Sequence, residues 1–499
     1  MSDGQPESSS TASQNDQLLP MPAAAQLLSR ALDAAPWFAQ VLAIVLFAYV
    51  LCQPVLLTPV LAVGVAVHVI SFVSLCRFLT PHRAPQHKTT PPAPAPAAAL
   101  ASECPDDKPG ISIIKPIAGT NDNLRENLES CFQLTYPKLE ILFCLHGADD
   151  KAVGVIEELI ARYPTVDARL LYGEAELEGA SPKVRNMAKG YAQATYDIFW
   201  AIDAKIRTSD GDVDAMVACL LGDAAVGLVH QLPWNQHGAD SGPVLERMFF
   251  GGAHARAYCL INGLGLPCTN GMSLMCKRSS WSAIGGCAAL SVTVAEDSLV
   301  GVLMQAKGYT CAMAAVPCVQ NPPPASVGSI VRRRARWYQL KAFEMDGGRW
   351  AAPFEFWLEH ASLLCLVAAQ LWTSTADPRL VACGTLGVLA MCAVLDATYT
   401  RVIDAATRAG IGPALSLPRT HVLKLAGLWL LNLLLPFAVI WRGLATSTIV
   451  WDCNGTLKPM HPKPYSAKLS EHRVSSNVGK CTHAARHNLG QVPVILASQ

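Results

Sequence analysis

Long apolar blocks near both ends of the chain constrain its fold more than any other feature. From Trp37 to Leu79 the sequence has no Asp, Glu or Lys, and no Arg before Arg77. This stretch exceeds the roughly 20 residues that one membrane span needs. Three more apolar blocks lie near residues 354–373, 378–396 and 420–441. Only 15% of the residues are charged, against about a quarter in soluble domains. The sequence therefore predicts membrane anchors on both sides of a more polar middle.

The first apolar block, residues 37–79, contains Pro54 and Pro59, which leave two arrangements open. It is either one span with an interfacial extension or a tight hairpin of two helices. Basic residues follow directly in "CRFLTPHRAPQHK", and the positive-inside rule places the next segment in the cytosol. Residues 1–36 are rich in Ser, Gln, Pro and Ala and lack the pattern of a cleavable signal peptide, so we expect them to be disordered.

The C-terminal transmembrane region, residues 346–441, is predicted to contain about three spans. Two acids and a histidine lie at the start of its first apolar block, so we expect that start to lie at the membrane interface. Asp396 and Asp404 are expected to bound the second span. The tail at 442–499 is polar and without periodicity, and we interpret its "NGT" glycosylation sequon as a chance match.

Between the apolar regions, a Pro- and Ala-rich linker at 80–109 leads into a soluble domain at 110–345. Buried-strand patterns occur at 111–117, 139–147, 167–173 and 196–203, and helix patterns at 123–134 and 152–163. This alternation predicts an α/β, Rossmann-like domain with a mostly parallel central sheet, covered by helices and flanked by the transmembrane helices. Ligands are expected beyond the carboxyl ends of the strands.

Charge and cysteine content narrow the possible partners. The net charge is +1, and neither a basic repeat nor a zinc-type spacing occurs, which argues against nucleic acid as a partner. The chain has 17 cysteines, several of them inside apolar runs, without the even spacing of a disulfide framework. We therefore expect reduced cysteines and a domain that faces the cytosol.

Acidic residues close two of the predicted strands. Asp149 and Asp150 follow the second strand in "LHGADD". An ordinary Gly- and Asp-rich turn is one interpretation, but a carboxylate at a strand end can also accept hydrogen bonds from a base or ribose. Asp203 closes "IFWAID", either as a simple strand-terminating acid or as a ligand of Mg²⁺ or Mn²⁺. Such an ion would stabilise the charge of a leaving diphosphate.

Two adjacent acids, Glu296 and Asp297, begin a predicted helix at 296–308. Helix N-termini favour acids, so a plain N-terminal pair is one interpretation. The residues "VTVA" directly before them indicate instead that the pair lies next to the core. A carboxylate in a partly dry cleft can have a raised pKa and take a proton from an attacking hydroxyl.

A basic run, "IVRRRARWYQLK", precedes the C-terminal apolar blocks. Such a run is commonly an anchor for lipid headgroups. Guanidinium groups also bind phosphates in a fork geometry, and the indole of Trp337 can pack against an acceptor. Both roles can coexist in one segment.

The order and spacing of these residues resemble those of the ceramide glucosyltransferase family, which are glycosyltransferases of the family A fold. In that family three spaced aspartates precede an R/Q-x-x-R-W motif. The corresponding residues here are Asp150, Asp203, Asp297 and Arg333-x-x-Arg336-Trp337. The stretches "SPKVRNMAKGY", "NGMSLMCKR" and "AEDSLVGVLMQAKGY" also resemble the family, and the likeness covers roughly residues 110–345. The family more often has another polar residue in place of Gly147, so either Asp149 or Asp150 could be the first aspartate.

The resemblance implies transfer of glucose from UDP-glucose to the primary hydroxyl of ceramide, with inversion, at the cytosolic membrane face. Asp150 would contact the uridine, Asp203 would hold a divalent metal on the diphosphate, and Asp297 would be the general base. Arg333, Arg336 and Trp337 would close over the diphosphate and the acceptor. Lys183 would add positive charge near the phosphates, with a surface loop lysine as the alternative.

Two other functions remain open. A related transferase could act on another lipid or on a polysaccharide, although such polysaccharide synthases usually have Gln where this chain has Arg333. A non-catalytic membrane scaffold is the other, but no catalytic acid of the motif set is lost. The resemblance further implies a multi-pass protein of the Golgi or endoplasmic reticulum membrane and leaves the oligomeric state open. His254, in "HARAY", is expected to be structural, with a place on the membrane face at a lipid entrance as the alternative.

Overall fold

The computed structural model describes residues 66–67, 69–75, 108–173, 177, 181–235, 238, 240–344, 378–411, 422–445, 449–453 and 456–460. The chain divides into two compact units, Met1–Val45 and Leu46–Gln499, and all described residues belong to the second. Several predicted features lie outside the described residues: the segment 1–36, most of the first apolar block, nearly all of the linker, the apolar block at 354–373, the sequon at Asn454 and the tail beyond residue 460.

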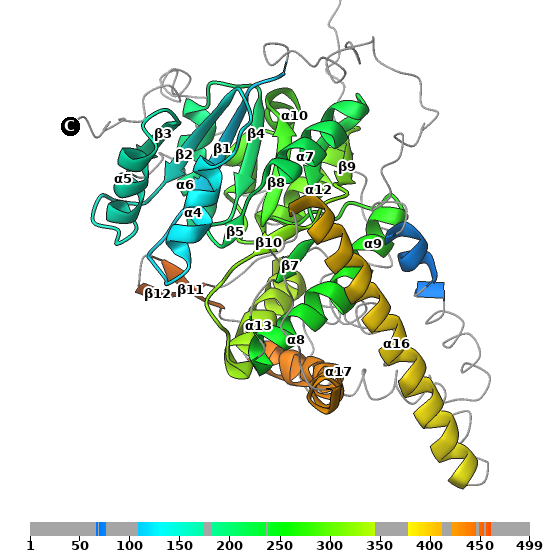
Figure 1. Ribbon diagram of the computed structural model, residues 1–499. Helices are drawn as coiled ribbons and strands as arrows, with labels where there is room; N and C mark the ends of the chain where they lie inside the picture. Colours follow the sequence, from blue (N-terminus) through cyan, green and yellow to red (C-terminus); the bar gives the residue numbers. More distant parts are fainter. Residues whose placement is uncertain are drawn as a thin grey trace, which may run out of the picture. The chain divides into compact units, whose positions relative to one another are not determined.

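A seven-stranded sheet forms the centre of the region predicted to be the soluble domain (Figure 1), in the order β3-β2-β1-β4-β8-β6-β9. Its strands are β1 (Ile111–Pro116), β2 (Leu139–Cys144), β3 (Asp167–Leu171), β4 (Ile198–Ile202), β6 (Val226–His230), β8 (Ser273–Lys277) and β9 (Thr310–Met313). All neighbouring pairs are parallel except those of β8, which is antiparallel to β4 and to β6. The prediction of a mostly parallel sheet is confirmed.

Helices cover both faces of this sheet because the strands are apolar on both sides. Ile113 of β1 faces a core shared with α4, α5 and α7, whereas its neighbour Ile114 faces a core shared with α6 and α12. The bounds of these helices are α4 (Leu124–Phe132), α5 (Val153–Arg162), α6 (Pro182–Gln193), α7 (Asp210–Gly222) and α12 (Glu296–Ala306). The predicted strands, and the helices predicted near 123–134, 152–163 and 296–308, are confirmed.

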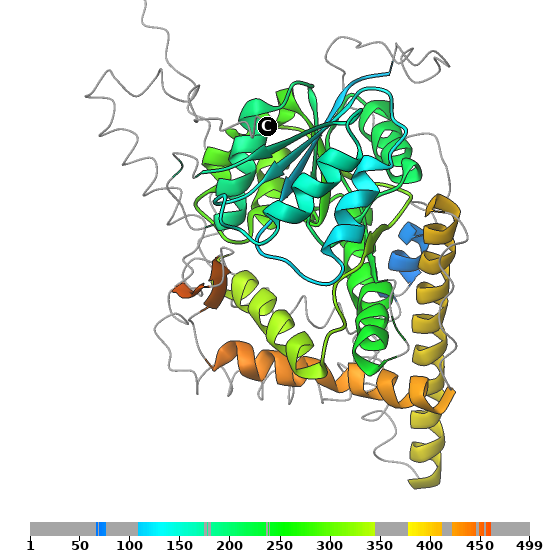
Figure 2. The same ribbon diagram turned by 60° about the vertical axis from the view of Figure 1, so that its left-hand side comes forward.

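A second group of elements lies next to the carboxyl ends of the strands. It contains a three-stranded sheet of β5 (Ile206–Arg207), β10 (Cys318–Gln320) and β7 (Pro233–Asn235). A continuous helical segment follows β7: α8 (Ser241–Met248), the π-helix η3 (Phe249–His254) and α9 (Ala255–Gly263). Helix α13 (Val327–Glu344) carries the basic run. Figure 2 shows α13 lying alongside α17 (Val422–Leu444), with which it packs.

Within the described part of the chain, α17 alone is long and apolar enough to cross a membrane, as judged by length and composition. It coincides with the apolar block predicted near 420–441. Helix α16 (Pro378–Ile411) covers the block near 378–396 but does not end at Asp396 or Asp404. No proline interrupts the sequence between these acids, and both carboxylates are paired: Asp396 with Arg256, and Asp404 with Arg408 one turn later. The helix can therefore continue through both acids.

Candidate active site

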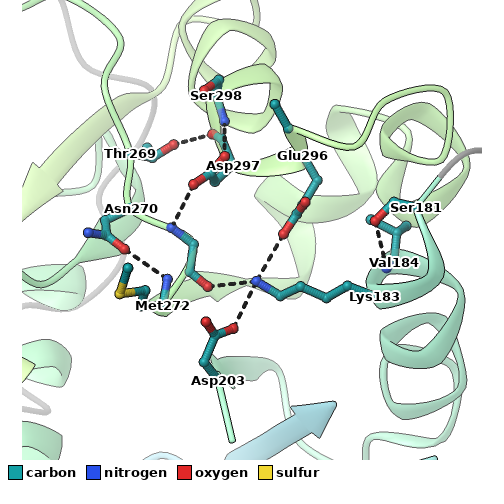
Figure 3. Close-up of polar contacts among 12 residues, drawn as sticks. Ser181, Lys183, Val184, Asp203, Thr269, Asn270, Met272, Glu296, Asp297 and Ser298 are labelled. Atoms are coloured by element: carbon teal, nitrogen blue, oxygen red, sulfur yellow. Dashed lines mark hydrogen bonds and ion pairs between the residues drawn. The ribbon is translucent and has the colours of Figure 1, made fainter. Parts of the chain in front are cut away.

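The polar centre of the site lies at the carboxyl end of β4, where Asp203 follows the strand directly. The backbone N–H of Asp203 donates to the carbonyl oxygen of Met272, 2.9 Å away, in the loop that enters β8. This bond holds the end of β4 against residues 270–272. The Asp203 carboxylate is thereby directed away from the sheet core and toward the first turns of α6 and α12 (Figure 3).

Lys183 joins three segments of the site. It lies in the first turn of α6, which Ser181 caps by accepting a hydrogen bond from the backbone N–H of Val184. The ammonium nitrogen lies 2.9 Å from Asp203 Oδ1 and 2.9 Å from Glu296 Oε1 (Figure 3). It also donates to the carbonyl oxygen of Gly271 at 2.9 Å. All three ammonium hydrogens therefore have oxygen acceptors, and the alternative of a surface loop lysine is wrong.

The charge of Lys183 follows from this environment. Burial disfavours the ammonium form, but the carboxylates of Asp203 and Glu296 outweigh it, so the pKa of Lys183 is raised above its ordinary value. Lys183 is therefore a permanent cation at physiological pH. The pKa of the Glu296 carboxyl is also raised, chiefly by burial and further by the nearby charge of Asp297, although Lys183 opposes this shift.

Asp297 is held differently from its neighbour Glu296. Its Oδ2 accepts the backbone N–H of Gly271 at 3.2 Å, and its Oδ1 accepts the N–H of Ser298 at 2.9 Å. A Cβ at position 271 would lie 2.9 Å from the Cβ of Asp297, so only glycine allows this close approach. The adjacent acids thus have separate partners: Glu296 neutralises a lysine, whereas Asp297 is oriented by backbone donors.

Helix α13 supplies cations and an aromatic ring to the same site. The Arg333 guanidinium pairs with the carboxylate of Glu246, which is only 2% exposed, and lies 5.3 Å from the centre of the Trp337 ring. Burial lowers the pKa of Arg336, and the nearby charge of Arg333 lowers it further. Arg332, in contrast, is exposed. The basic run therefore faces two environments, and only part of it is available to lipid headgroups.

These groups surround one cavity of ≈ 300 Å³. Six of the seven residues predicted for the site line it: Lys183, Asp203, Asp297, Arg333, Arg336 and Trp337. Apolar residues of α13 and α17 line it as well: Leu340, Pro436 and Val439. The cavity therefore connects a charged region at the sheet edge with the helix of membrane-spanning length.

Asp150 is not among the residues that line this cavity. It lies in the turn after β2, and its carboxylate accepts the backbone N–H of Gly119 at 2.9 and 3.1 Å and that of Ala152 at 2.9 Å. Gly119 follows β1, the neighbour of β2 and β4 in the sheet. Asp150 therefore lies at the same edge of the sheet as Asp203, where it connects two loops.

Sequence reasoning missed Lys205 and Glu246 as residues of the site, and it favoured a structural role for His254. Lys205 lies with its ammonium 3.8 Å from Asp203 Oδ2, and burial lowers its pKa. Glu246 lies in α8, and the mixed polar and apolar sequence of this helix, "SGPVLERM", gives no sign of a site. His254 ends the π-helix η3, lines the cavity and stacks on Tyr258 with ring centres 4.4 Å apart. Burial lowers the pKa of His254 well below its ordinary value, so its ring is neutral.

The carboxylate oxygens of the site suit a hard divalent cation by chemistry, but they already have cationic partners. Asp203 and Glu296 share Lys183, and within the described residues no group of three His, Cys, Asp or Glu side chains is arranged to hold a metal ion. A metal ion on Asp203 would therefore have to share or replace the ammonium of Lys183. In the described part of the chain, a metal ion could therefore be coordinated only by Asp203 together with oxygen atoms of a bound ligand.

Replacement of Lys183 by Met tests the three-way ion pair. The Lys183→Met variant leaves the Glu296 carboxylate without its cationic partner and Asp203 with only the Lys205 ammonium, 3.8 Å away. We therefore expect the free energy of unfolding to fall by about 3 kcal/mol. Urea denaturation of the protein in detergent micelles would measure this. In the double variant Lys183→Met/Glu296→Gln the loss should be smaller than in the single variant, because one uncompensated charge is removed. Equal or additive losses would contradict the pairing.

The sequence of the chain is similar to those of several known proteins. Ceramide glucosyltransferase 3 of Caenorhabditis elegans is 38% identical over 234 residues, which make up 47% of this chain and 50% of that protein. The ceramide glucosyltransferase of Komagataella phaffii is 36% identical over 190 residues, 34% of this chain and 37% of that protein. The chain spans about half the length of the curated relatives it matches.

Among solved structures, a mannosyltransferase from Pyrobaculum calidifontis in complex with GDP-Man and Mn²⁺ is 17% identical. The alignment covers 77% of this chain and 99% of that one, with a TM-score of 0.41, a value too low to support an inference. Residues 60–454, well over half of the chain, match glycosyl transferase family 21. The chain belongs to glycosyl transferase family 21.

Proposed function

We propose that the protein transfers glucose from UDP-glucose to the primary hydroxyl of ceramide, with inversion, at the cytosolic face of a Golgi or endoplasmic reticulum membrane. One observation carries this proposal: a single cavity extends from Lys183, Asp203 and Asp297 to Pro436 and Val439 of α17. A charged, soluble donor and an apolar, membrane-bound acceptor need a site of this kind. The names of the relatives support glucose as the sugar and ceramide as the acceptor.

The charged end of the cavity is the proposed donor site. Arg333 and Arg336 can bind the diphosphate of UDP-glucose through their guanidinium groups, and Lys183 adds a third cation. Asp150, at the same sheet edge, is proposed to contact the uridine. We further propose that Asp203 holds Mg²⁺ or Mn²⁺; such an ion, when bound, stabilises the charge of the departing diphosphate. These cations favour departure of UDP by compensating the negative charge that it gains.

The apolar end is the proposed acceptor site. Ceramide is too apolar to leave the bilayer, whereas UDP-glucose is charged, so the two can react only at the membrane surface. Pro436 and Val439 of α17, with Leu340 of α13, provide an apolar wall within the same cavity as the acids. The opposite face of α17 is exposed, with Leu434 and Trp441 among its residues. This arrangement supports a lipid-facing helix that guides the acceptor headgroup toward Asp297.

Asp297 is the proposed general base. A single displacement with inversion needs one proton acceptor on the side of the attacking hydroxyl and a stabilised leaving group, and no covalent sugar intermediate. The carboxylate of Asp297 lines the cavity and is oriented by the N–H groups of Gly271 and Ser298. The ceramide hydroxyl would attack the anomeric carbon while its proton passes to this carboxylate. The bond between that carbon and the diphosphate oxygen breaks, and UDP leaves.

The experiment that tests the proposal identifies the product. Membranes that contain the protein are incubated with labelled UDP-glucose and a panel of ceramide, sterol, diacylglycerol and oligosaccharide acceptors, and the products are analysed by mass spectrometry. We expect label in glucosylceramide. Asp297→Asn, as the matched control, should lower transfer by about 100-fold or more while it leaves binding of UDP-glucose nearly intact. Label in a sterol, diacylglycerol or saccharide would contradict the acceptor, and near wild-type transfer by Asp297→Asn would contradict the base.

A second prediction concerns the acceptor wall. Val439→Trp adds a large side chain on the cavity side of α17, so we expect the KM for ceramide to rise by roughly tenfold or more, with the affinity for UDP-glucose unchanged. Leu434→Trp is the matched control, because Leu434 lies on the exposed face of the same helix and is 60% exposed. It should leave both constants unchanged. Equal effects of the two variants on the KM for ceramide would mean that this face of α17 does not contact the acceptor.

A further inference from the structure

Helix α12, which carries Glu296 and Asp297, begins without a capping side chain of its own. Its N-cap residue is Ala295, which has no side chain able to accept a hydrogen bond. The first N–H groups of a helix have no partner within the helix, and buried N–H groups need one from elsewhere. The N–H of Ala295 has two acceptors: the hydroxyl oxygen of Thr293, 3.0 Å away, and the carboxylate of Glu344, the last residue of the distant helix α13, 2.9 Å away.

Three donors converge on the Glu344 carboxylate. Oε2 accepts the N–H of Ala295 at 2.9 Å and the hydroxyl of Thr293 at 2.5 Å. The N–H of Val294 lies 3.2 Å from Oε1 and 3.1 Å from Oε2. Glu344 and Thr293 are both 0% exposed. Only an ionised carboxylate offers two acceptor oxygens and no donor, so an amide at position 344 would place an N–H₂ group toward these donors.

The middle of the same helix carries the arginines of the site. Arg333 and Glu344 lie about three helical turns apart on α13. Val294 and Ala295, whose N–H groups Glu344 holds, line the cavity together with Arg333. A helix is stiff over this length, so α13 fixes the start of α12 at a constant distance from the arginines. Asp297 at the start of α12 and the arginines of α13 are the residues proposed to act on opposite sides of the anomeric carbon.

We propose that Glu344 is a positioning residue that holds Asp297 in register with Arg333 and Arg336. The chemical part of this inference depends on the proposed function, because it assumes that Asp297 accepts the proton and that the arginines bind the leaving diphosphate. Glu344 itself lies behind the cavity wall and touches neither substrate. Its role is to keep the proton acceptor and the leaving-group cations at the separation that a one-step displacement needs.

The test uses the full-length protein and the Glu344→Gln variant, which keeps the size of the side chain. Glu157→Gln is the matched control, since Glu157 is exposed on α5, which connects β2 to the edge strand β3 and does not line the cavity. Amide hydrogen exchange is measured first, in detergent or lipid nanodiscs and without substrate. In Glu344→Gln the amides of Val294 and Ala295 should exchange about tenfold faster or more, while those of α4 stay unchanged. Unchanged exchange at residues 294 and 295 would overturn the inference.

The kinetic part compares transfer with hydrolysis of the donor. Loss of alignment should lower kcat for transfer to ceramide by roughly ten- to hundredfold, with the KM for UDP-glucose unchanged. Donor hydrolysis needs the cations but not the aligned acceptor, so the ratio of transfer to hydrolysis should fall as well. This ratio does not depend on the folded fraction, since both reactions report the same folded molecules. A wild-type ratio in Glu344→Gln, with faster exchange, would show a purely structural role and overturn the inference.

The two parts separate this inference from the proposed function. If the wild-type protein formed no glucosylceramide, the proposed function would fail, and the exchange measurement would still decide whether Glu344 holds the start of α12. If wild type formed glucosylceramide and the variant kept its full transfer rate, only the positioning role would fail. Glu157→Gln should match wild type in exchange, kcat and the ratio.

Discussion

The site depends on one interaction, the ammonium of Lys183 between the carboxylates of Asp203 and Glu296. These carboxylates belong to the end of β4 and the start of α12, which are distant in the sequence, and the lysine belongs to α6. Two acids this close would repel each other and be costly to bury without a counter-charge. The positive charge of Lys183 offsets the cost of burying them. The neighbouring Asp297 is instead oriented by the backbone N–H groups of Gly271 and Ser298.

From this centre the cavity has two chemically different ends. Arginines and Trp337 of α13 border the charged end, whereas Pro436 and Val439 of α17 border the apolar end. Arg334, between Arg333 and Arg336 in sequence, lies 3.6 Å from the Phe249 ring centre and donates to Asn432 of α17 at 3.4 Å. The helix that binds phosphate in our proposal is therefore packed directly on the helix of membrane-spanning length. This contact gives a physical reason why a charged donor and a lipid acceptor could meet at one place.

Much of the fold could be predicted from the sequence because it rests on local patterns. The apolar runs of β1, β2 and β4 identify the sheet, and the acids that follow β2 and β4 or begin α12 indicate the edge at which the cavity lies. Contacts between distant segments could not be predicted: the partners of Lys183, the pairing of Arg333 with Glu246, and the hold of Glu344 on Ala295 depend on tertiary packing. Asp150 illustrates the limit. Its position after β2 indicates the correct edge of the sheet, but whether it lines the main cavity depends on the path of the loop.

The most direct test of the account is a cryo-electron microscopy structure of the protein in lipid nanodiscs with UDP bound. The account predicts diphosphate density within hydrogen-bonding distance of Arg333 and Arg336, next to Asp203, with the uridine directed toward Asp150. The space between Asp297 and Val439 should stay open to the lipid. Nucleotide density outside this cavity, or a bound UDP that fills the space beside Val439, would contradict the claim that one cavity holds both the donor and the acceptor.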